Sequence, residues 1–333
     1  MSASKEGTPL LLTGSRPAER AGGVGAWAAE RPWIWSFLAA LLAWVAISVI
    51  AGRGWIGTIT STFGLVPFLV LVGIGQMVVI TLGDGNIDLS LPNTLTLAAF
   101  VSTGTMNGGN GSTLLGFLFP VLIALLIGAV NSALILLLRI PPIVATLSVG
   151  LMLQSAVLIY SSGLQATVDP DVVAFTRFRV LGLSLLGLIC VVMAVAAGFV
   201  LFRTSYGRSV QAIGQKIQAA RLTGIPVTRV IVSSYLISSV FAAVAGVLLG
   251  AFSTPNLDLG QPYLLNSIAV VVLGGSLIAG GRSNVTGIWG SSLFLLLLLT
   301  FLDTIGASVA VQNIVKGALI ILVLLLVGAK RNE

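Results

Sequence analysis

Charged residues are almost absent from long stretches of this chain, and that scarcity limits the folds open to it more than any other feature. Asp84 and Asp88 carry the only charges between Arg53 and Arg139. Across all 333 residues, 8% are charged and 56% are hydrophobic, whereas soluble domains contain about 25% charged residues. No soluble fold can hide so large a share of apolar surface. The composition predicts an integral membrane protein, and a mean hydropathy of +1.08 agrees with this.

Apolar runs separated by glycine, proline and charge predict an all-α membrane protein with about ten transmembrane helices. The first run, Trp33–Gly52, has 20 residues, or about 30 Å of helix, the thickness of a bilayer core. Its flanks predict a retained span rather than a cleaved signal peptide. The ten spans are expected near 33–52, 63–82, 89–107, 113–138, 141–161, 181–202, 230–252, 264–280, 285–304 and 309–328. The chain is accordingly divided into an N-terminal segment 1–32, a transmembrane domain 33–329 and a tail 330–333.

The basic residues orient these spans. In a ten-span arrangement, 13 of the 17 Lys and Arg residues fall on one side and three on the other, while Lys316 lies within the last span. Cytoplasmic loops carry an excess of Lys and Arg, so both termini are expected in the cytoplasm. Segment 203–229, with five basic residues and no acid, is expected to be a central cytoplasmic loop. Because the net charge of +7 follows from this bias, it predicts no nucleic-acid partner.

Missing residue types exclude several classes of chemistry. The chain has no histidine and a single cysteine, Cys190, so histidine-dependent catalysis, histidine-ligated metal and disulfides are excluded. Cys190 itself is expected to serve only in helix packing. No G-x-x-x-x-G-K-[ST] motif is present, so the chain does not bind ATP through a P-loop. We therefore predict no enzyme activity, metal or cofactor in this chain, and any ATP is hydrolysed on another subunit.

Glycine-interrupted segments occur in both halves of the chain. Leu82–Gly85 follows one apolar run, and Leu273–Gly275 with Gly280–Gly281 follows another. Such segments at corresponding positions mark the path in transporters built from repeats, although glycine also serves close helix packing. The ten spans divide into two sets of five, each with one span followed by four more. This order predicts two inverted-repeat-like halves around the central loop.

The central loop carries a specific motif. Its segment Gln218-Ala219-Ala220-Arg221-Leu222-Thr223-Gly224 resembles the E-A-A-x-x-x-G signature of ABC-importer permeases, with Gln218 in place of Glu. Small residues at 219 and 220 would let a short helix seat against a partner, and Gly224 would end that helix. A solvated basic loop is the alternative. The candidate coupling residues are Arg208, Gln218, Ala219, Ala220, Arg221 and Gly224.

Three blocks in the same order strengthen the resemblance. The stretch from Thr204 to Ile225, the segment Gly83–Ser90 and the segment Ile268–Arg282 are similar to blocks of the ribose-type (monosaccharide) ABC-importer permeases. This family implies a permease in the bacterial inner membrane that imports a pentose- or hexose-like sugar. It also implies three kinds of partner: ATPase subunits on the cytoplasmic side, a periplasmic substrate-binding protein, and a second permease subunit in a homo- or heterodimer.

Polar residues in apolar surroundings are the candidates for the translocation path, because sugar hydroxyls need amides and carboxylates as partners. An interhelical hydrogen bond is the competing interpretation for each amide. A path role is favoured for Asp84 and Asp88, since intramembrane carboxylates usually face a cavity or a partner. Lys316 is expected either to pair with one of these aspartates or to extend to the membrane surface. The candidates are Gln76, Asp84, Asn86, Asp88, Asn93, Asn131 and Asn266, together with Gln154 and Asn313.

Two other transport functions stay open. A branched-chain amino-acid ABC permease shares the general architecture. A self-sufficient ten-span secondary transporter would need neither an ATPase nor a long basic loop at its centre. The segment 162–180, on the outer side, is either a surface for a soluble partner or a solvated connector.

Overall fold

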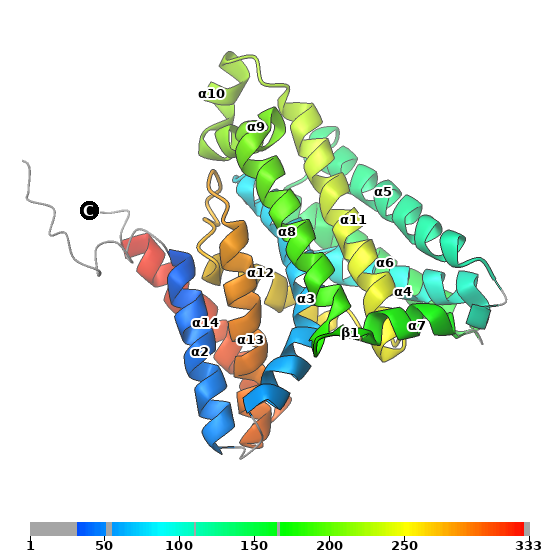
Figure 1. The fold of residues 1–333 in the computed structure, drawn as a ribbon. Coiled ribbons are helices and arrows are strands. Elements are labelled where there is room, and N and C mark those ends of the chain that lie inside the picture. The colour runs from blue at the N-terminus through cyan, green and yellow to red at the C-terminus, as the bar shows by residue number, and fades with distance from the viewer. Residues whose placement is uncertain (1–31, 51–54, 110, 165–166, 330–333) are drawn as a thin grey trace, which may run out of the picture.

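A computed structural model describes residues 32–50, 55–109, 111–164 and 167–329, and most of them are helical (Figure 1). The prediction of an all-α membrane protein is confirmed. The terminal segments 1–31 and 330–333 lie outside the described residues, as does Arg53.

Each of the ten predicted spans corresponds to a helix. These helices are α2 (Pro32–Ile50), α3 (Trp55–Thr81), α4 (Leu91–Met106), α5 (Thr113–Leu136), α6 (Pro142–Ser161), α8 (Leu185–Arg203), α11 (Val227–Ser253), α12 (Gln261–Leu273), α13 (Val285–Thr304) and α14 (Val309–Ala329). The connections hold η1 (Asn107–Gly109), α7 (Pro170–Arg177), the antiparallel pair β1 (Arg179–Val180) and β2 (Leu183–Ser184), α9 (Ser205–Gln215) and α10 (Ile217–Leu222).

The helices differ in their ability to cross a bilayer. Among the described residues, seven helices have the length and composition to do so: α2, α3, α5, α6, α8, α11 and α13. By contrast, α4 has 16 residues and α12 has 13, or about 24 and 20 Å of helix. Non-helical backbone adjoins both short helices, and such backbone is tolerated at membrane depth only where protein or a wet cavity surrounds it.

The helix lengths support two inverted halves. Helices α3 and α11 each have 27 residues and run in opposite directions along the bundle (Figure 1). Each is followed by a non-helical segment, 82–90 or 254–260, and then by a short helix with a proline in its first turn. The segment of the second half that corresponds to 82–90 is therefore 254–260. The glycines of 273–281 follow α12 and not α11, so their predicted correspondence with Leu82–Gly85 is wrong.

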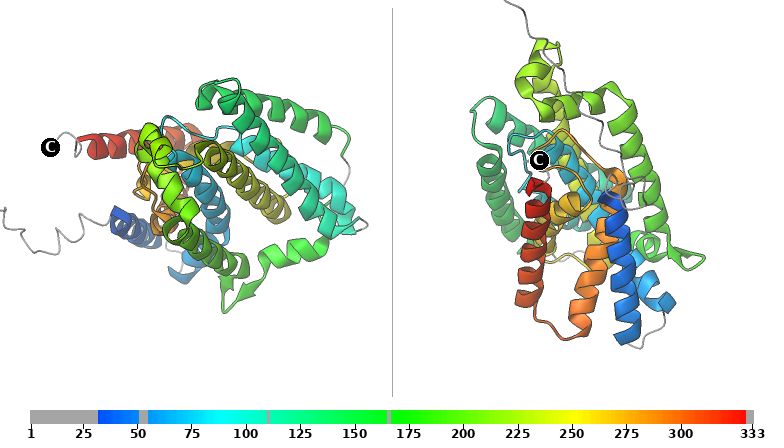
Figure 2. Two further views of the ribbon diagram at one scale, coloured as in Figure 1. Left: turned by 90° about the horizontal axis from the view of Figure 1, so that it is seen from above. Right: turned by 90° about the vertical axis from the view of Figure 1, so that its left-hand side faces the viewer.

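The core is centred on α3, which packs against α11, α12, α13 and α8. Its residues from Val66 to Thr81 are all buried. The outer helices instead expose large apolar side chains, such as Leu42, Leu126 and Val192, as expected where lipid is the solvent. Helices α2, α13 and α14 form one side of the bundle, and α5 and α6 form the other (Figure 2).

Candidate coupling surface and translocation site

The central loop folds into two short helices at one end of the bundle. The hydroxyl of Thr204 accepts a 3.3 Å hydrogen bond from the Gly207 amide and so caps α9. At the end of α10, Gly224 has a φ of +80°. The amide of Gly224 donates to the Arg221 carbonyl at 3.1 Å, and the amide of Ile225 donates to the Ala220 carbonyl at 3.2 Å. This is the Schellman pattern, so Gly224 ends the helix as the sequence predicts.

The coupling candidates divide into exposed and buried side chains. Ala220 is 3% exposed and belongs to a buried cluster of this chain that includes Val210, Ile213 and Val230. Its methyl group therefore packs inside this chain. The sequence interpretation instead placed it against a partner. The exposed candidates are Arg208, Gln218, Ala219, Arg221 and Gly224.

Leu222 completes this surface, although the sequence analysis did not select it. Its side chain is 90% exposed at the end of α10. A large apolar residue directly after Arg221, in the last turn before Gly224, was the signal available in the sequence.

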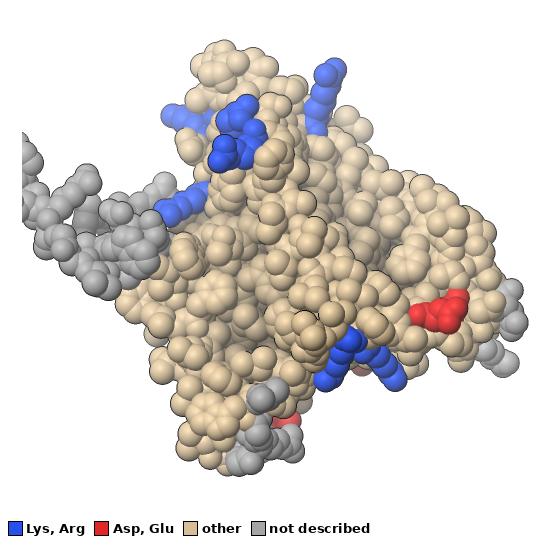
Figure 3. Space-filling view, in the orientation of Figure 1, with Lys and Arg blue, Asp and Glu red and all other residues tan. Residues whose placement is uncertain are grey.

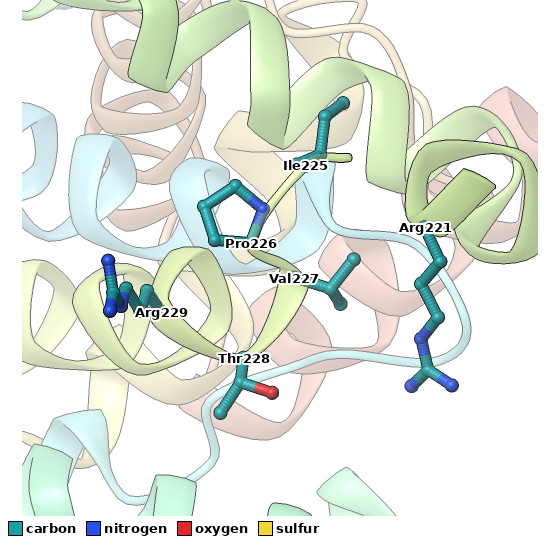
Figure 4. A pocket seen from close by; sticks show the side chains of 6 residues that line it. All are labelled: Arg221, Ile225, Pro226, Val227, Thr228 and Arg229. Carbon is teal, nitrogen blue, oxygen red and sulfur yellow. The ribbon is translucent and has the colours of Figure 1, made fainter. Parts of the chain in front are cut away.

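A basic hollow of about 490 Å³ lies between α10 and the start of α11. Arg221 and Arg229 stand at its two sides, with Pro226 and Val227 between them (Figure 4). On the face that Figure 3 shows, basic side chains gather around α9 and α10, above a broad band without charge. Its two arginines give the hollow a positive charge.

The three sequence blocks meet in space at a junction of glycines. The Gly281 amide donates to the Thr81 carbonyl at 2.9 Å. Gly214, near the end of α9, lies against both residues, and a Cβ at this position would clash with the Thr81 carbonyl oxygen and the Gly281 nitrogen. A Cβ on Gly83 would lie 2.8 Å from the Ala279 carbonyl oxygen. Segment 203–229 thus contacts both glycine-interrupted segments through closely packed backbone at Gly214.

Asp88 anchors the broken segment 82–90 to its neighbours. Its Oδ1 accepts hydrogen bonds from the amide and hydroxyl of Ser90, at 3.1 and 2.6 Å, at the start of α4. Its Oδ2 accepts from the Ser238 hydroxyl of α11 at 2.8 Å. The Asn131 amide of α5 donates to the Ser90 hydroxyl at 2.8 Å. The carboxylate is 2% exposed, so protein groups occupy both of its oxygens.

Asn86 makes a second link from the same segment to α11. Its amide nitrogen donates to the Gly83 carbonyl at 2.8 Å, and its Oδ1 accepts from the Tyr235 hydroxyl at 2.8 Å. Asp84, in contrast, is exposed and has a φ of +48°. Of the two carboxylates, Asp84 is the one open to solvent or solute.

The remaining path candidates are scattered. Gln76 is fully buried, and neither polar atom of its side-chain amide has a hydrogen-bond partner among the described residues. The Oδ1 atoms of Asn131 and Asn266 are also buried without such a partner. The Asn93 amide donates to the Gly150 carbonyl at 2.8 Å and so joins α4 to α6. Gln154 and Asn313 are exposed on the outer faces of α6 and α14.

Lys316 does not pair with an aspartate in the described part of the chain. It is 6% exposed on α14, which packs against α12. The oxygens of Asp88 bind hydroxyl and backbone groups instead. The pairing considered from the sequence is therefore not found.

The opposite end of the bundle carries α7 and the β1–β2 hairpin. Asp169 caps α7 by accepting from the Asp171 amide at 2.9 Å, and it also accepts from the Thr113 hydroxyl. These hydrogen bonds, the one from Thr113 first, hold the pKa of Asp169 below its ordinary value. The acid thereby ties α7 to the start of α5.

Comparison with known proteins identifies the family. The profile of a family described as "Branched-chain amino acid transport system / permease component" matches residues 58–324. The chain belongs to this permease family. An autoinducer 2 import system permease protein, LsrD, from Photorhabdus temperata is 33% identical over 254 residues, which cover 72% of this chain and 74% of that protein. The protein of the same name from Escherichia coli strain K12 is 32% identical over 248 residues, covering 72% and 75%. No solved structure matches the chain.

The resemblance to ABC-importer permeases is confirmed by this membership. The protein is a multi-pass membrane permease, a transport subunit rather than an enzyme.

Proposed function

We propose that this permease is the membrane-spanning subunit of an importer for a sugar or sugar-like solute, driven by ATP hydrolysis on a separate subunit. The glycine junction of Thr81, Gly214 and Gly281 carries the proposal. It would give an ATPase bound at α9 and α10 a rigid contact with the end of α3 and with the glycine-containing loop after α12. Close backbone contacts transmit small displacements because packed interfaces do not deform continuously.

The ATPase is proposed to bind at α10 and the adjoining basic hollow. Leu222 and Ala219 supply an exposed apolar surface, and Arg221 and Arg229 supply charge for acidic partner residues. A buried apolar anchor surrounded by charged pairs is the usual arrangement at a protein interface. A substrate-binding protein would dock at the opposite end, where α7 lies.

A second permease copy is proposed on the exposed face of α6. Gln154 exposes an amide there, among large apolar side chains such as Leu151 and Leu158. An amide facing lipid lacks hydrogen-bond partners, so protein or a wet path is expected to cover this position. Solute would then pass between two copies.

Sugar is favoured over a branched-chain amino acid because the similar proteins are named autoinducer 2 import permeases. The family description keeps the amino acid as the second candidate. The test is uptake into proteoliposomes that hold the permease, its ATPase and its binding protein. ATP-dependent uptake of a pentose or hexose, without uptake of leucine, supports the proposal. Leucine uptake supports the second candidate, and uptake without an ATPase refutes both.

A further inference from the structure

The end of the bundle opposite α9 and α10 has an apolar protrusion. Phe178 is 57% exposed, Val180 is 38% exposed and Leu181, at the tip of the hairpin, is 100% exposed. Leu181 and Gly182 both have positive φ, of 50° and 83°. Asn-Gly or Asp-Gly normally occupies such a two-residue turn. A leucine at this strained and fully exposed position has no partner in the described protein to account for it.

The hairpin continues the lipid-facing surface of α8. The Leu185 amide, at the start of α8, donates to the Phe178 carbonyl at 2.9 Å and fixes the hairpin to that helix. Farther along, α8 exposes Val192 and Val195, each by 68%. Helix α7 packs against α11 and α8 where α11 ends and α8 begins, and it runs at a steep angle to α8 (Figure 1). The hairpin therefore lies at the level where a bilayer around α8 ends.

Two arginines accompany the apolar side chains. Arg177 donates from Nη2 to the Phe252 carbonyl at the end of α11, at 3.3 Å. The side chain of Arg179 is exposed, and its guanidinium forms no hydrogen bond or ion pair with the described residues. Basic side chains project from this end in Figure 3. Long basic side chains beside aromatic ones are typical of the headgroup level, where the stem lies in apolar surroundings and the charge reaches phosphate.

We propose that residues 178–182 form a membrane anchor, with Phe178 and Leu181 inserted among acyl chains and Arg179 bound to the phosphate of an anionic lipid. Continuity with the exposed face of α8 and the charge of Arg179 identify lipid as the occupant, in preference to a soluble protein. The anchor would hold α7 flat on the bilayer. It does not depend on which solute the permease carries.

Spin-label accessibility tests insertion. The full chain, carrying Cys190→Ala and either Leu181→Cys or Leu222→Cys, is labelled with a nitroxide and placed in nanodiscs of phosphatidylcholine with one-third phosphatidylglycerol. Leu222 is a matched control because it is a similarly exposed leucine at the opposite end. We expect the label at 181 to collide more with oxygen than with a water-soluble nickel complex, and the label at 222 to show the reverse. Water-like accessibility at 181 overturns the proposal, whether or not a periplasmic protein later covers the hairpin.

Lipid titration tests the role of Arg179. Arg179→Gln is expected to weaken phosphatidylglycerol binding, measured as quenching of the label at 181 by headgroup-labelled phosphatidylglycerol, by about fivefold, the contribution of one basic residue near an anionic surface. Arg221→Gln, at the opposite end, should leave that binding unchanged. Equal binding by Arg179→Gln and the unsubstituted protein would refute the arginine contact. Since neither measurement uses transport, failure here leaves the proposed function standing.

Discussion

The amide nitrogen of Gly281 donates a 2.9 Å hydrogen bond to the carbonyl oxygen of Thr81, and it thereby joins the end of α3 to the loop after α12. Gly214 of α9 fills the space beside this bond without a side chain. A displacement of α9 would therefore act on the end of α3 and the loop after α12 together.

Gly214→Ala should disrupt the junction. The added methyl group would collide with the Thr81 carbonyl and the Gly281 amide, and overpacking of this kind costs about 1–3 kcal/mol. We expect a lower midpoint of thermal unfolding and transport reduced by at least tenfold. Gly64→Ala is the control, because a Cβ there has open space around it. Equal transport by the two variants would contradict a role for the junction.

The two aspartates of segment 82–90 should respond differently. Asp88→Ala leaves the hydroxyls of Ser90 and Ser238 without their acceptor and should lower the free energy of unfolding by about 1–3 kcal/mol. Asp88→Asn keeps an acceptor and should recover most of that loss. Asp84→Asn should leave stability unchanged, since the side chain is exposed and asparagine tolerates positive φ.

Uptake separates the roles of these carboxylates. If the charge of Asp84 faces the solute path, uptake by Asp84→Asn falls while its unfolding curve is unchanged. Normal uptake by Asp84→Asn, together with a large transport defect in a stable Asp88→Asn protein, would reverse the two assignments.

Docking of the ATPase should depend on the exposed side of α10. Ala219→Glu places a carboxylate on the surface and should weaken co-purification of the ATPase while expression stays normal. Ala220→Glu instead buries a charge in the permease's own core and should lower the yield of folded protein. An ATPase that binds both the original protein and Ala219→Glu equally well would place its docking site elsewhere.

Sequence reasoning predicted what depends on local pattern. The approximate positions of the ten helices that match the predicted spans follow from apolar run length, and the end of α10 at Gly224 follows from the backbone freedom of glycine. The side of α10 that faces inward could not be predicted, because Ala219 and Ala220 are identical and only tertiary packing distinguishes them. The contact between Thr81, Gly214 and Gly281 is likewise invisible in sequence, since backbone groups make it.

The opposite ends of the bundle should lie on opposite sides of the membrane. Asp171 and Gln215 are both exposed, and the native Cys190 is buried, so single cysteines at 171 and 215 can be labelled without background. We expect a membrane-impermeant maleimide to reach Asp171→Cys in intact cells and Gln215→Cys only after lysis. Labelling of both from outside would rule out cytoplasmic placement of the central loop.

A second permease copy should cover α6 near Gln154. In a Cys190→Ala background, Gln154→Cys is expected to form a covalent dimer with a short bismaleimide in intact membranes, because an exposed amide at this depth needs protein or water beside it. Val192→Cys on α8 is the control, since its apolar side chain suits lipid and is highly exposed. A heterodimer would show the product only when a second permease with a cysteine at the equivalent position is co-expressed. Crosslinking at 192 but not at 154, with either partner, would place the interface on α8 and remove the basis for a path along α6.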